Sequence, residues 1–255
     1  MQLKGMDQLR KHVPDVRSPG GVVRVVLYLL AWVFLVTYYF LTTDQIPTWS
    51  IDSQIIIMAL GFLLLSMFFS QRKVYKEKYG KLAYRNAFAH FAVPGLGSIF
   101  AAIAHAGYMN GPRVPQGWWN MAFDILGWFL LITGLVLWIR SVLTFGVGNL
   151  AMLYVYHPEE GKIVNSAIYN VLRHPIYAGA LRVGLGLALI NGNANSLAFA
   201  LLMPLGFFGW IRLVEEKELI DRFGQSYVEY RKRVPAFWPK PGGLGAYFKF
   251  LIRGS

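Results

Sequence analysis

Two clusters of ionisable residues in the last third of the chain have the composition of a small-molecule binding site. In the first cluster, Arg173 and His174 precede Pro175, and Tyr177 follows within the same apolar stretch. Proline suits the first turn of a helix, because its missing N–H group has no partner there. An arginine, a histidine and the free N–H groups of a helix start favour an anion such as a carboxylate or a phosphate. The alternative is that Arg173 reaches lipid headgroups and His174 only caps the helix.

The second cluster is a pair of adjacent acids, Glu215 and Glu216, which follows another apolar stretch. Acidic groups at the C-terminal end of a helix oppose its dipole, so they need cationic partners. Neighbouring helix residues point about 100° apart, so the two acids cannot serve one ligand atom. We expect one acid to pair with a fixed cation such as Arg173 and the other to face a cleft. The alternative is a solvated acid pair that leans on Arg212 and Lys217.

Apolar and aromatic residues recur after the acids with spacings of four, four, three and four. They are Leu219, Phe223, Tyr227, Tyr230 and Val234. This pattern predicts one amphipathic cytoplasmic helix that ends at Pro235. Core packing explains such aromatic residues more often than ligand binding does.

Composition limits the other kinds of site. The sequence has no cysteine, which excludes disulfides, thiolate nucleophiles and thiolate metal centres, and we expect no metal. Gly146 and Gly148 would let the backbone approach a ligand closely. In a membrane protein, however, a Gly-x-Gly pattern usually serves helix packing.

The elements that would hold these clusters are membrane helices. Hydrophobic residues make up 55% of the 255-residue chain and charged residues only 15%. Stretches long enough to span a bilayer, or nearly so, occur at 22–41, 51–70, 87–108, 121–142, 176–190 and 196–214. The third is weaker, because it contains His90, Pro94, Gly95, Gly97 and His105, and it is expected to be broken or kinked. The fifth is short and forms a tight hairpin with the sixth.

The basic residues predict the orientation of these spans. They gather before the first span, between the second and third, between the fourth and fifth, and after the sixth. The three loops on the opposite side contain a single basic residue, Arg113. Six spans with both termini in the cytoplasm therefore place every basic cluster on the cytoplasmic side. We attribute the net charge of +12 to this asymmetry and to contact with membrane lipids, and expect no nucleic acid partner.

The two clusters also carry a family resemblance. Arg-His-Pro-x-Tyr-x-Gly at 173–179, the acid pair, and Phe-Gly-x-x-Tyr-x-x-Tyr-x-x-x-Val-Pro at 223–235 resemble the isoprenylcysteine carboxyl methyltransferase and phospholipid methyltransferase family. The stretch 162–169 is also similar, although Ala167 stands where glycine is usual. The resemblance covers about the last two-fifths of the chain. Together with the apolar stretches, it divides the chain into an N-terminal transmembrane region of four spans at 1–142, a methyltransferase-like region with two spans at 143–239 and a basic tail at 240–255. The fold expected is an all-α integral membrane protein.

The resemblance implies that S-adenosylmethionine enters from the cytoplasm into a pocket at this face, which the C-terminal helix covers. Its carboxylate suits Arg173 and His174, its ammonium and ribose hydroxyls suit a glutamate, and its sulfonium suits tyrosines. The expected cofactor-binding residues are Gly148, Tyr169, His174, Tyr177, Glu215 and Tyr227. Arg173 and Glu216 are the expected catalytic residues: Arg173 would hold a carboxylate or thiolate acceptor, and Glu216 or Glu215 would deprotonate an amine.

The acceptor itself is left open by the resemblance. Relatives of this kind methylate prenylcysteine-like carboxylates, lipid amines or small thiols, and a lipophilic acceptor would arrive sideways from the bilayer. An NADPH-dependent reductase of the sterol-reductase type is one alternative, which the short cytoplasmic segments disfavour. A non-enzymatic transport or assembly protein is another. The gathering of ionisable residues at one face rather than in mid-membrane argues against it.

Overall fold

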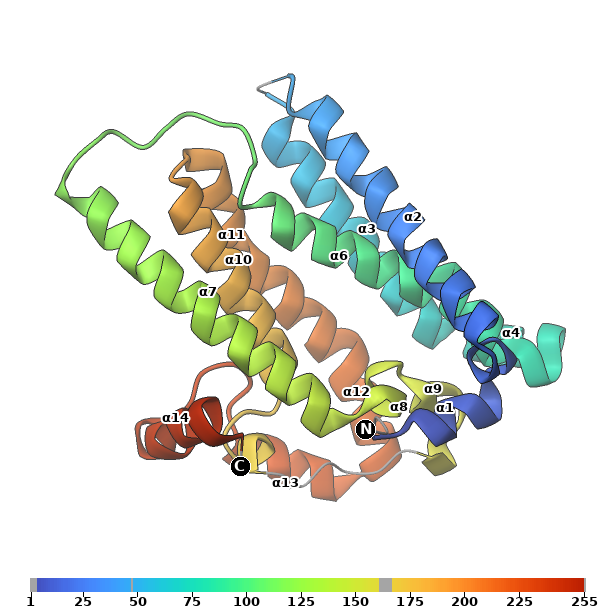
Figure 1. The fold of residues 1–255 in the computed structure, drawn as a ribbon. Coiled ribbons are helices and arrows are strands. Elements are labelled where there is room, and N and C mark those ends of the chain that lie inside the picture. Colours follow the sequence, from blue (N-terminus) through green and yellow to red (C-terminus); the bar gives the residue numbers. More distant parts are fainter. Residues whose placement is uncertain (1–3, 47, 161–166, 255) are drawn as a thin grey trace.

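The structure, a computed structural model, describes residues 4–46, 48–160 and 167–254. The described part is helical and contains no β-strand, which confirms the all-α prediction (Figure 1). A single isolated antiparallel bridge joins Arg113 to Asn193. Lys162 and the rest of the family-like stretch up to residue 166 lie outside the described residues.

Among the described residues, five helical segments are long and apolar enough to cross a membrane. Three of them are single helices: α2 (Pro19–Thr43), α3 (Ser50–Ser70) and α7 (Trp118–Phe145). The fourth is the run Arg72–His105, which contains α4 (Arg72–Tyr79), α5 (Ala83–Ala87) and α6 (Val93–His105). The fifth is the run Ala194–Phe223, which contains α11 (Ala194–Trp210) and α12 (Glu216–Phe223). The sixth expected span is α10 (Pro175–Asn191). Its 17 residues give a length of about 26 Å, slightly less than the hydrocarbon core. The chain is thus an integral membrane protein.

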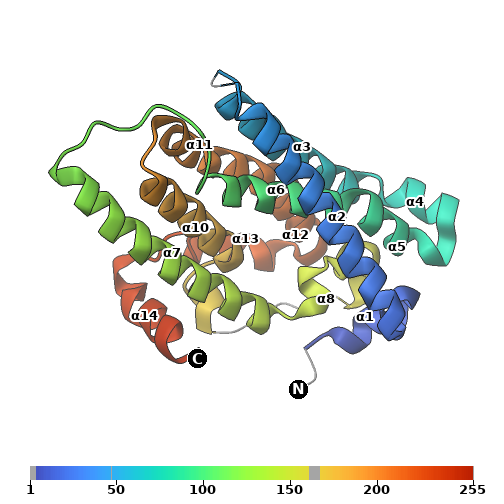
Figure 2. The same ribbon diagram turned by 45° about the horizontal axis from the view of Figure 1, so that its top comes forward.

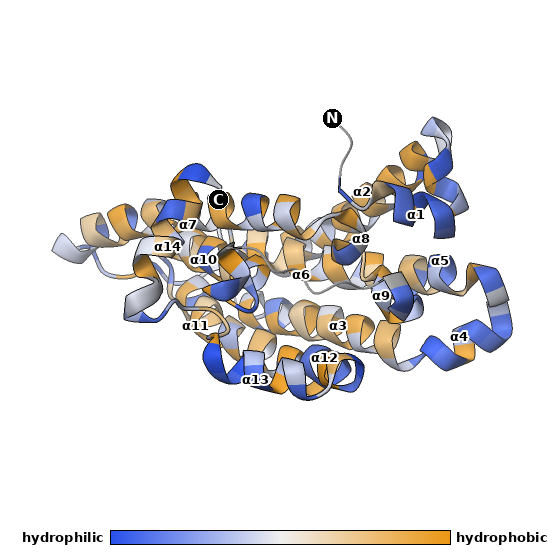
Figure 3. Ribbon diagram, turned by 90° about the horizontal axis from the view of Figure 1, so that it is seen from below, coloured by the Kyte–Doolittle hydropathy of each residue, from blue (hydrophilic) through white to orange (hydrophobic). Residues whose placement is uncertain are grey.

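Polar elements gather at one end of this helical bundle. Figure 1 shows both termini at that end, together with α1 (Met6–His12), α8 (Val147–Leu150), α9 (Leu153–Tyr156), α13 (Gln225–Arg233) and α14 (Leu244–Arg253). Figure 3 shows hydrophilic residues concentrated on α1, α4, α12 and α13, whereas α2, α3 and α7 are mostly hydrophobic. The loop between α6 and α7 and the turn between α10 and α11 lie at the opposite end.

Close helix contact fixes the position of α10. Gly127 and Gly134 on α7 face Gly186 and Gly179 on the antiparallel α10 (Figure 2). A methyl group on Gly134 would lie only 3.0 Å from the carbonyl oxygen of Gly179, and one on Gly186 only 2.7 Å from that of Gly127. Such small residues let two backbones approach closely in a membrane. The N-terminus of α10 is therefore held at a defined depth beside the end of α7.

The third apolar stretch is irregular, as its proline predicted. A π-helical segment, Phe88–Ala92, separates α5 from α6. Pro94 has no N–H group to donate to a carbonyl one turn earlier, and a π turn is one way in which a helix absorbs such a loss.

The prediction of a single amphipathic helix over the aromatic stripe is wrong, because the structure has two helices there. Gly224 interrupts it with a φ of 59°, which separates α12 from α13. This backbone conformation is costly for residues with a side chain and is readily adopted by glycine. The second half ends at Arg233, just before Pro235, as predicted. The hinge lets α13 turn away from the direction of α11 and α12 while its Tyr227 remains buried.

The C-terminal segment contains a helix, α14, that packs on the bundle. Tyr247 and Phe250 of α14 are buried in a cluster with Leu137 and Leu172. Arg140 of α7 donates hydrogen bonds to the carbonyl oxygens of Phe250 and Ile252 at the end of this helix.

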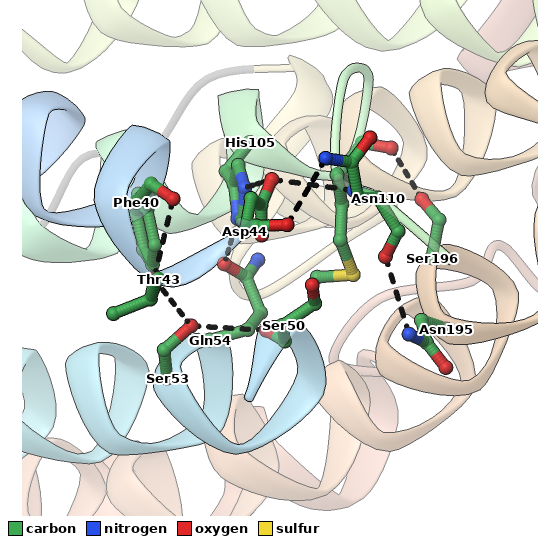
Figure 4. A network of polar contacts seen from close by, with 12 residues as sticks. Phe40, Thr43, Asp44, Ser50, Ser53, Gln54, His105, Asn110, Asn195 and Ser196 are labelled. Atoms are coloured by element: carbon green, nitrogen blue, oxygen red, sulfur yellow. Dashed lines mark hydrogen bonds and ion pairs between the residues drawn. The ribbon is translucent and has the colours of Figure 1, made fainter. Parts of the chain in front are cut away.

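A buried polar network closes the opposite end of the bundle (Figure 4). His105 Nε2 lies 2.9 Å from Asp44 Oδ2, and its Nδ1 lies 2.7 Å from Gln54 Oε1. Asn110 donates its backbone N–H to the same Asp44 oxygen. These contacts tie the ends of α2, α3 and α6 together. His105 thus stabilises the third apolar segment despite its polarity.

Candidate active site

A cavity of about 340 Å³ joins the polar end of the molecule to the membrane helices. Its apolar wall comes from α3, α6 and α11 and includes Phe62, Leu65, Leu96, Ile99, Phe100, Phe207 and Trp210. Its polar wall comes from the start of α10, the π-helical turn Ile211–Glu215, α12 and α13, and includes Arg173, His174, Glu215, Arg222 and Tyr227. The volume falls in the range of small-molecule sites.

The segment after α13 holds the start of α10 in place. The backbone N–H groups of Arg173 and His174 donate to the carbonyl oxygens of Pro235 and Ala236, at 2.9 and 3.1 Å. Pro175 is the first residue of α10, as predicted. Two segments that are about 60 residues apart in sequence therefore meet at one wall of the cavity.

Arg173 is fixed by contacts within the protein. Its Nε and Nη2 atoms lie 3.0 and 2.9 Å from Glu216 Oε1. Its Nη1 donates to the carbonyl oxygens of Arg231 and Val234, and only 12% of its side chain is exposed. The guanidinium therefore does not extend to lipid headgroups. The expectation that one acid of the pair would contact Arg173 is met by Glu216.

Glu216 lies in a cationic cage. His174 Nε2 is 3.3 Å and the hydroxyl of Tyr227 is 3.4 Å from its Oε1. Arg231 Nη1 is 3.5 Å from its Oε2. Both oxygens of Glu216 are thus occupied, and its role as a base remains a prediction that this geometry does not favour.

Glu215 faces the cavity instead. Its side chain is buried, and among the described residues its Oε2 has no hydrogen-bond partner. The nearest ring nitrogen, His174 Nδ1, lies 4.0 Å from Oε2. A buried carboxylate oxygen without a donor is energetically costly. An oxygen of this kind in a cavity wall suits a ligand that brings its own N–H or O–H group.

Tyrosines surround the polar wall. The predicted Tyr169, Tyr177 and Tyr227 all line the cavity, as does Tyr230. Burial raises the pKa of Tyr169 and Tyr227, and it raises the pKa of Tyr230 to about 12. These phenols are therefore neutral near pH 7. They offer hydroxyl groups and aromatic faces to a ligand, and they cannot serve as bases there.

The structure places Gly148 away from the cavity. A side chain at this position would meet Gln8 and Gly5 of the N-terminal segment, at 3.2 and 3.3 Å. Asn149 and Leu150, which follow it, do line the cavity. The geometry favours a packing role for Gly148 over contact with a cofactor.

Arg222, Met152 and Tyr154 are among the lining residues that the sequence did not single out. Arg222 extends across the ring of Tyr154, with 4.1 Å between the guanidinium carbon and the ring centre, and it pairs with Glu218 at 3.4 Å. Met152 has a φ of 52°, the only positive value among the described non-glycine residues. Arg222 lies directly before Phe223 of the family-like motif, which is a signal that could have identified it. Tyr154 and Met152 belong to a short stretch without periodicity, and the sequence gives no such signal for them.

Comparison with known proteins gives consistent matches. The family model described as phospholipid methyltransferase matches residues 123–226. Protein-S-isoprenylcysteine O-methyltransferase B of Arabidopsis thaliana is 31% identical over 151 residues, which are 59% of this chain and 74% of that protein. The protein-S-isoprenylcysteine O-methyltransferase of Schizosaccharomyces pombe is 38% identical over 77 residues, which are 30% of this chain and 33% of that protein.

A bacterial protein named for a different acceptor also matches. The methanethiol S-methyltransferase of Pseudomonas deceptionensis is 32% identical over 115 residues, which are 45% of this chain and 42% of that protein. The chain thus spans less than half the length of this protein and of the yeast relative. No solved structure gives a significant match. Within the described residues, no group of three or more His, Asp or Glu side chains is arranged to hold a metal ion.

Proposed function

Because this chain belongs to the family of isoprenylcysteine O-methyltransferases and phospholipid methyltransferases, we propose that it transfers a methyl group from S-adenosylmethionine to a lipophilic acceptor that enters from the bilayer. The observation that carries the proposal is the two-sided cavity. One wall is charged and lies at the polar end of the molecule, and the other is built from apolar membrane helices. Family membership does not favour the nicotinamide-dependent reductase.

The polar wall fits the chemistry of S-adenosylmethionine. Bound there, it would supply an activated methyl group on a positively charged sulfur. Arg222 and His174, beside the protein-held Arg173, offer donors for its carboxylate, and the unpartnered Oε2 of Glu215 offers an acceptor for its ammonium or ribose hydroxyls. Neutral tyrosines around the cavity suit the sulfonium through their faces and oxygens.

The charges of the cavity favour an anionic acceptor. Arg173, Arg222 and Arg233 line it, whereas Glu215 is the single acid in the lining that the structure describes. A carboxylate or thiolate already carries the electron pair that attacks the methyl group, so it needs no general base. Prenylcysteine-like carboxylates and small thiols agree with the names of the matched relatives. The chain would then contribute alignment and exclusion of water.

We place this site at the cytoplasmic face. Lys73 and Lys76 belong to α4, and Arg231 and Lys232 belong to α13, two elements that Figure 3 shows as hydrophilic, and basic residues mark the cytoplasmic side of membrane proteins. A cytoplasmic cofactor and a membrane-dissolved acceptor would then approach the cavity from different sides.

Binding and turnover test this function separately. Calorimetric titration of the purified protein should show binding of S-adenosylmethionine and none of NADPH. Radiolabelled methyl transfer should then be faster to a farnesylated cysteine derivative or to methanethiol than to phosphatidylethanolamine. Binding of NADPH alone would contradict the methyltransferase, and preferential labelling of phosphatidylethanolamine would contradict only the anionic acceptor.

A further inference from the structure

A second cavity, of about 230 Å³, has Arg173 as the one lining residue that it shares with the first cavity among the described residues. Both residues of the Arg173–Glu216 pair line it, together with Arg212 and Arg231. Three guanidinium groups therefore share this space with one carboxylate. The cavity has an excess of positive charge and would attract an anion.

Two of these guanidinium groups have N–H donors to spare. In the part of the chain that the structure describes, Arg212 makes no hydrogen bond or ion pair, and its guanidinium carbon lies 5.9 Å from the centre of the Phe208 ring. Arg231 contacts Glu216 through one nitrogen at 3.5 Å, and its side chain is 36% exposed. Arg173 is held by the protein, so Arg212 and Arg231 are the groups that can turn to a ligand.

A stripe of lipid-facing residues on α11 leads to this cavity. Leu201, Leu205 and Phe208 are 72%, 68% and 49% exposed, and Arg212 follows them. Their spacings of four, three and four place all four residues on one face of the helix. An acyl chain that lies along the first three residues brings the attached headgroup to Arg212. The position of the cavity at the end of an apolar face thus indicates a lipid rather than a soluble anion.

We propose that this second cavity binds the phosphate group of an anionic phospholipid, with Arg212 and Arg231 as the donors. Basic pockets between membrane helices on the cytoplasmic side are suited to such headgroups. A zwitterionic lipid offers the same phosphate but adds a cation, which the excess positive charge disfavours. The proposal does not depend on methyl transfer, because Arg212 and Arg231 line the second cavity and not the first.

Native mass spectrometry of the full-length protein tests the proposal without turnover. The wild-type protein, mixed with equal amounts of phosphatidylglycerol and phosphatidylcholine, should retain phosphatidylglycerol preferentially. Arg212→Gln should lower the affinity for phosphatidylglycerol by about tenfold, as expected for the loss of one charge-assisted contact. Lys232→Gln is the matched control, since it removes an equal charge from the exposed residue next to Arg231 and outside the cavity lining, and it should leave the preference unchanged.

Several outcomes would overturn the proposal. The first is that the wild-type protein retains the two lipids equally. The second is that Arg212→Gln keeps the wild-type preference for phosphatidylglycerol. The third is that Lys232→Gln loses as much affinity for phosphatidylglycerol as Arg212→Gln does. Inorganic phosphate supplies the same group without an acyl chain. If millimolar phosphate raised the melting temperature of the protein as much as phosphatidylglycerol does, the ligand of this cavity would be a free anion and not a lipid. Thermal unfolding of each variant in phosphatidylcholine alone should match the wild type, which separates loss of binding from loss of fold.

Discussion

At the scale of single residues, Glu215 and Glu216 show how two identical neighbours acquire different surroundings. Glu216 contacts two arginines, a histidine and a tyrosine. Glu215 points to the cavity with one oxygen unpartnered among the described residues. The difference follows from the helix geometry, which turns adjacent side chains in different directions.

We expect the two acids to respond differently to the same substitution. Glu216→Gln leaves the buried Arg173 without its counter-ion, and loss of one partner of a buried pair costs about 3–5 kcal/mol. Glu215→Gln keeps the shape of the side chain and removes only its charge. It should weaken binding of S-adenosylmethionine by more than about tenfold, with little change in melting temperature. Calorimetry and thermal unfolding of both variants in detergent measure these effects, and equal modest effects in both would indicate a simple interfacial charge patch.

Arg173 should not tolerate replacement by lysine. Its planar group reaches Glu216 and two carbonyl oxygens at once, which the single ammonium of lysine cannot do. Arg173→Lys should therefore lower methyl transfer by more than about tenfold, a loss near 1.4 kcal/mol in the transition state. Arg231→Lys is a matched comparison, since this half-exposed arginine makes one longer contact with the same acid, and its effect should be small. Normal turnover by Arg173→Lys would show that the fixed pair is dispensable.

At the scale of elements, Gly224 decides the direction of α13. No atom lies within 4 Å of the position that a side chain would take there, so its positive φ is the only obstacle to substitution. Gly224→Ala should destabilise the protein by about 1–3 kcal/mol, because a φ of 59° with a ψ of −139° is sparsely populated by residues with a side chain. Gly209→Ala, inside the helical run of α11 and equally free of contacts, should be neutral or stabilising. Thermal unfolding compares the two, and equal effects would mean that the hinge carries no strain.

The sequence was sufficient for most helices but not for the contacts between them. Apolar length and basic asymmetry predicted the membrane helices, and Pro175 predicted a helix start that the structure confirms. The irregularity expected around Pro94 takes the form of a π-helical turn at Phe88–Ala92. Gly224 was not recognised as a break, because the aromatic stripe continues across it with helical spacing. His105 interrupts an apolar stretch in the sequence, and its partner Asp44 lies 61 residues earlier. Periodicity cannot report such a pairing.

The residues of the site were predictable only where they belong to local sequence motifs. Arg173, His174 and Glu215 were found because they belong to short local motifs. The cage around Glu216 includes Arg231, and the cavity includes Tyr154 and Met152, which only the tertiary fold brings near. The choice between the two acids also required the fold, because it depends on which side of the helix faces Arg173.

At the scale of the whole molecule, the two ends of the bundle have different characters. One end carries the termini, the basic helices and both cavities. The other end is closed by the network around His105 and by the hairpin between α10 and α11, where Ala194 donates its N–H to the carbonyl oxygen of Pro112. This asymmetry is what a membrane enzyme with a site at one face requires.

The same asymmetry predicts the orientation of the chain in the membrane. Because the sequence has no cysteine, single cysteines report their own accessibility. Gln45, Gln116 and Ala194 are exposed at the end that we assign to the outside, whereas Lys76 and Lys240 are exposed at the basic end. Gln45→Cys, Gln116→Cys and Ala194→Cys should react with a membrane-impermeant maleimide on intact cells. Lys76→Cys and Lys240→Cys should react only after the membrane is opened, because basic residues are retained on the cytoplasmic side. Labelling of the two lysine positions from outside would reverse the orientation, and the cavity would then face away from the cytoplasmic supply of S-adenosylmethionine that the proposed reaction requires.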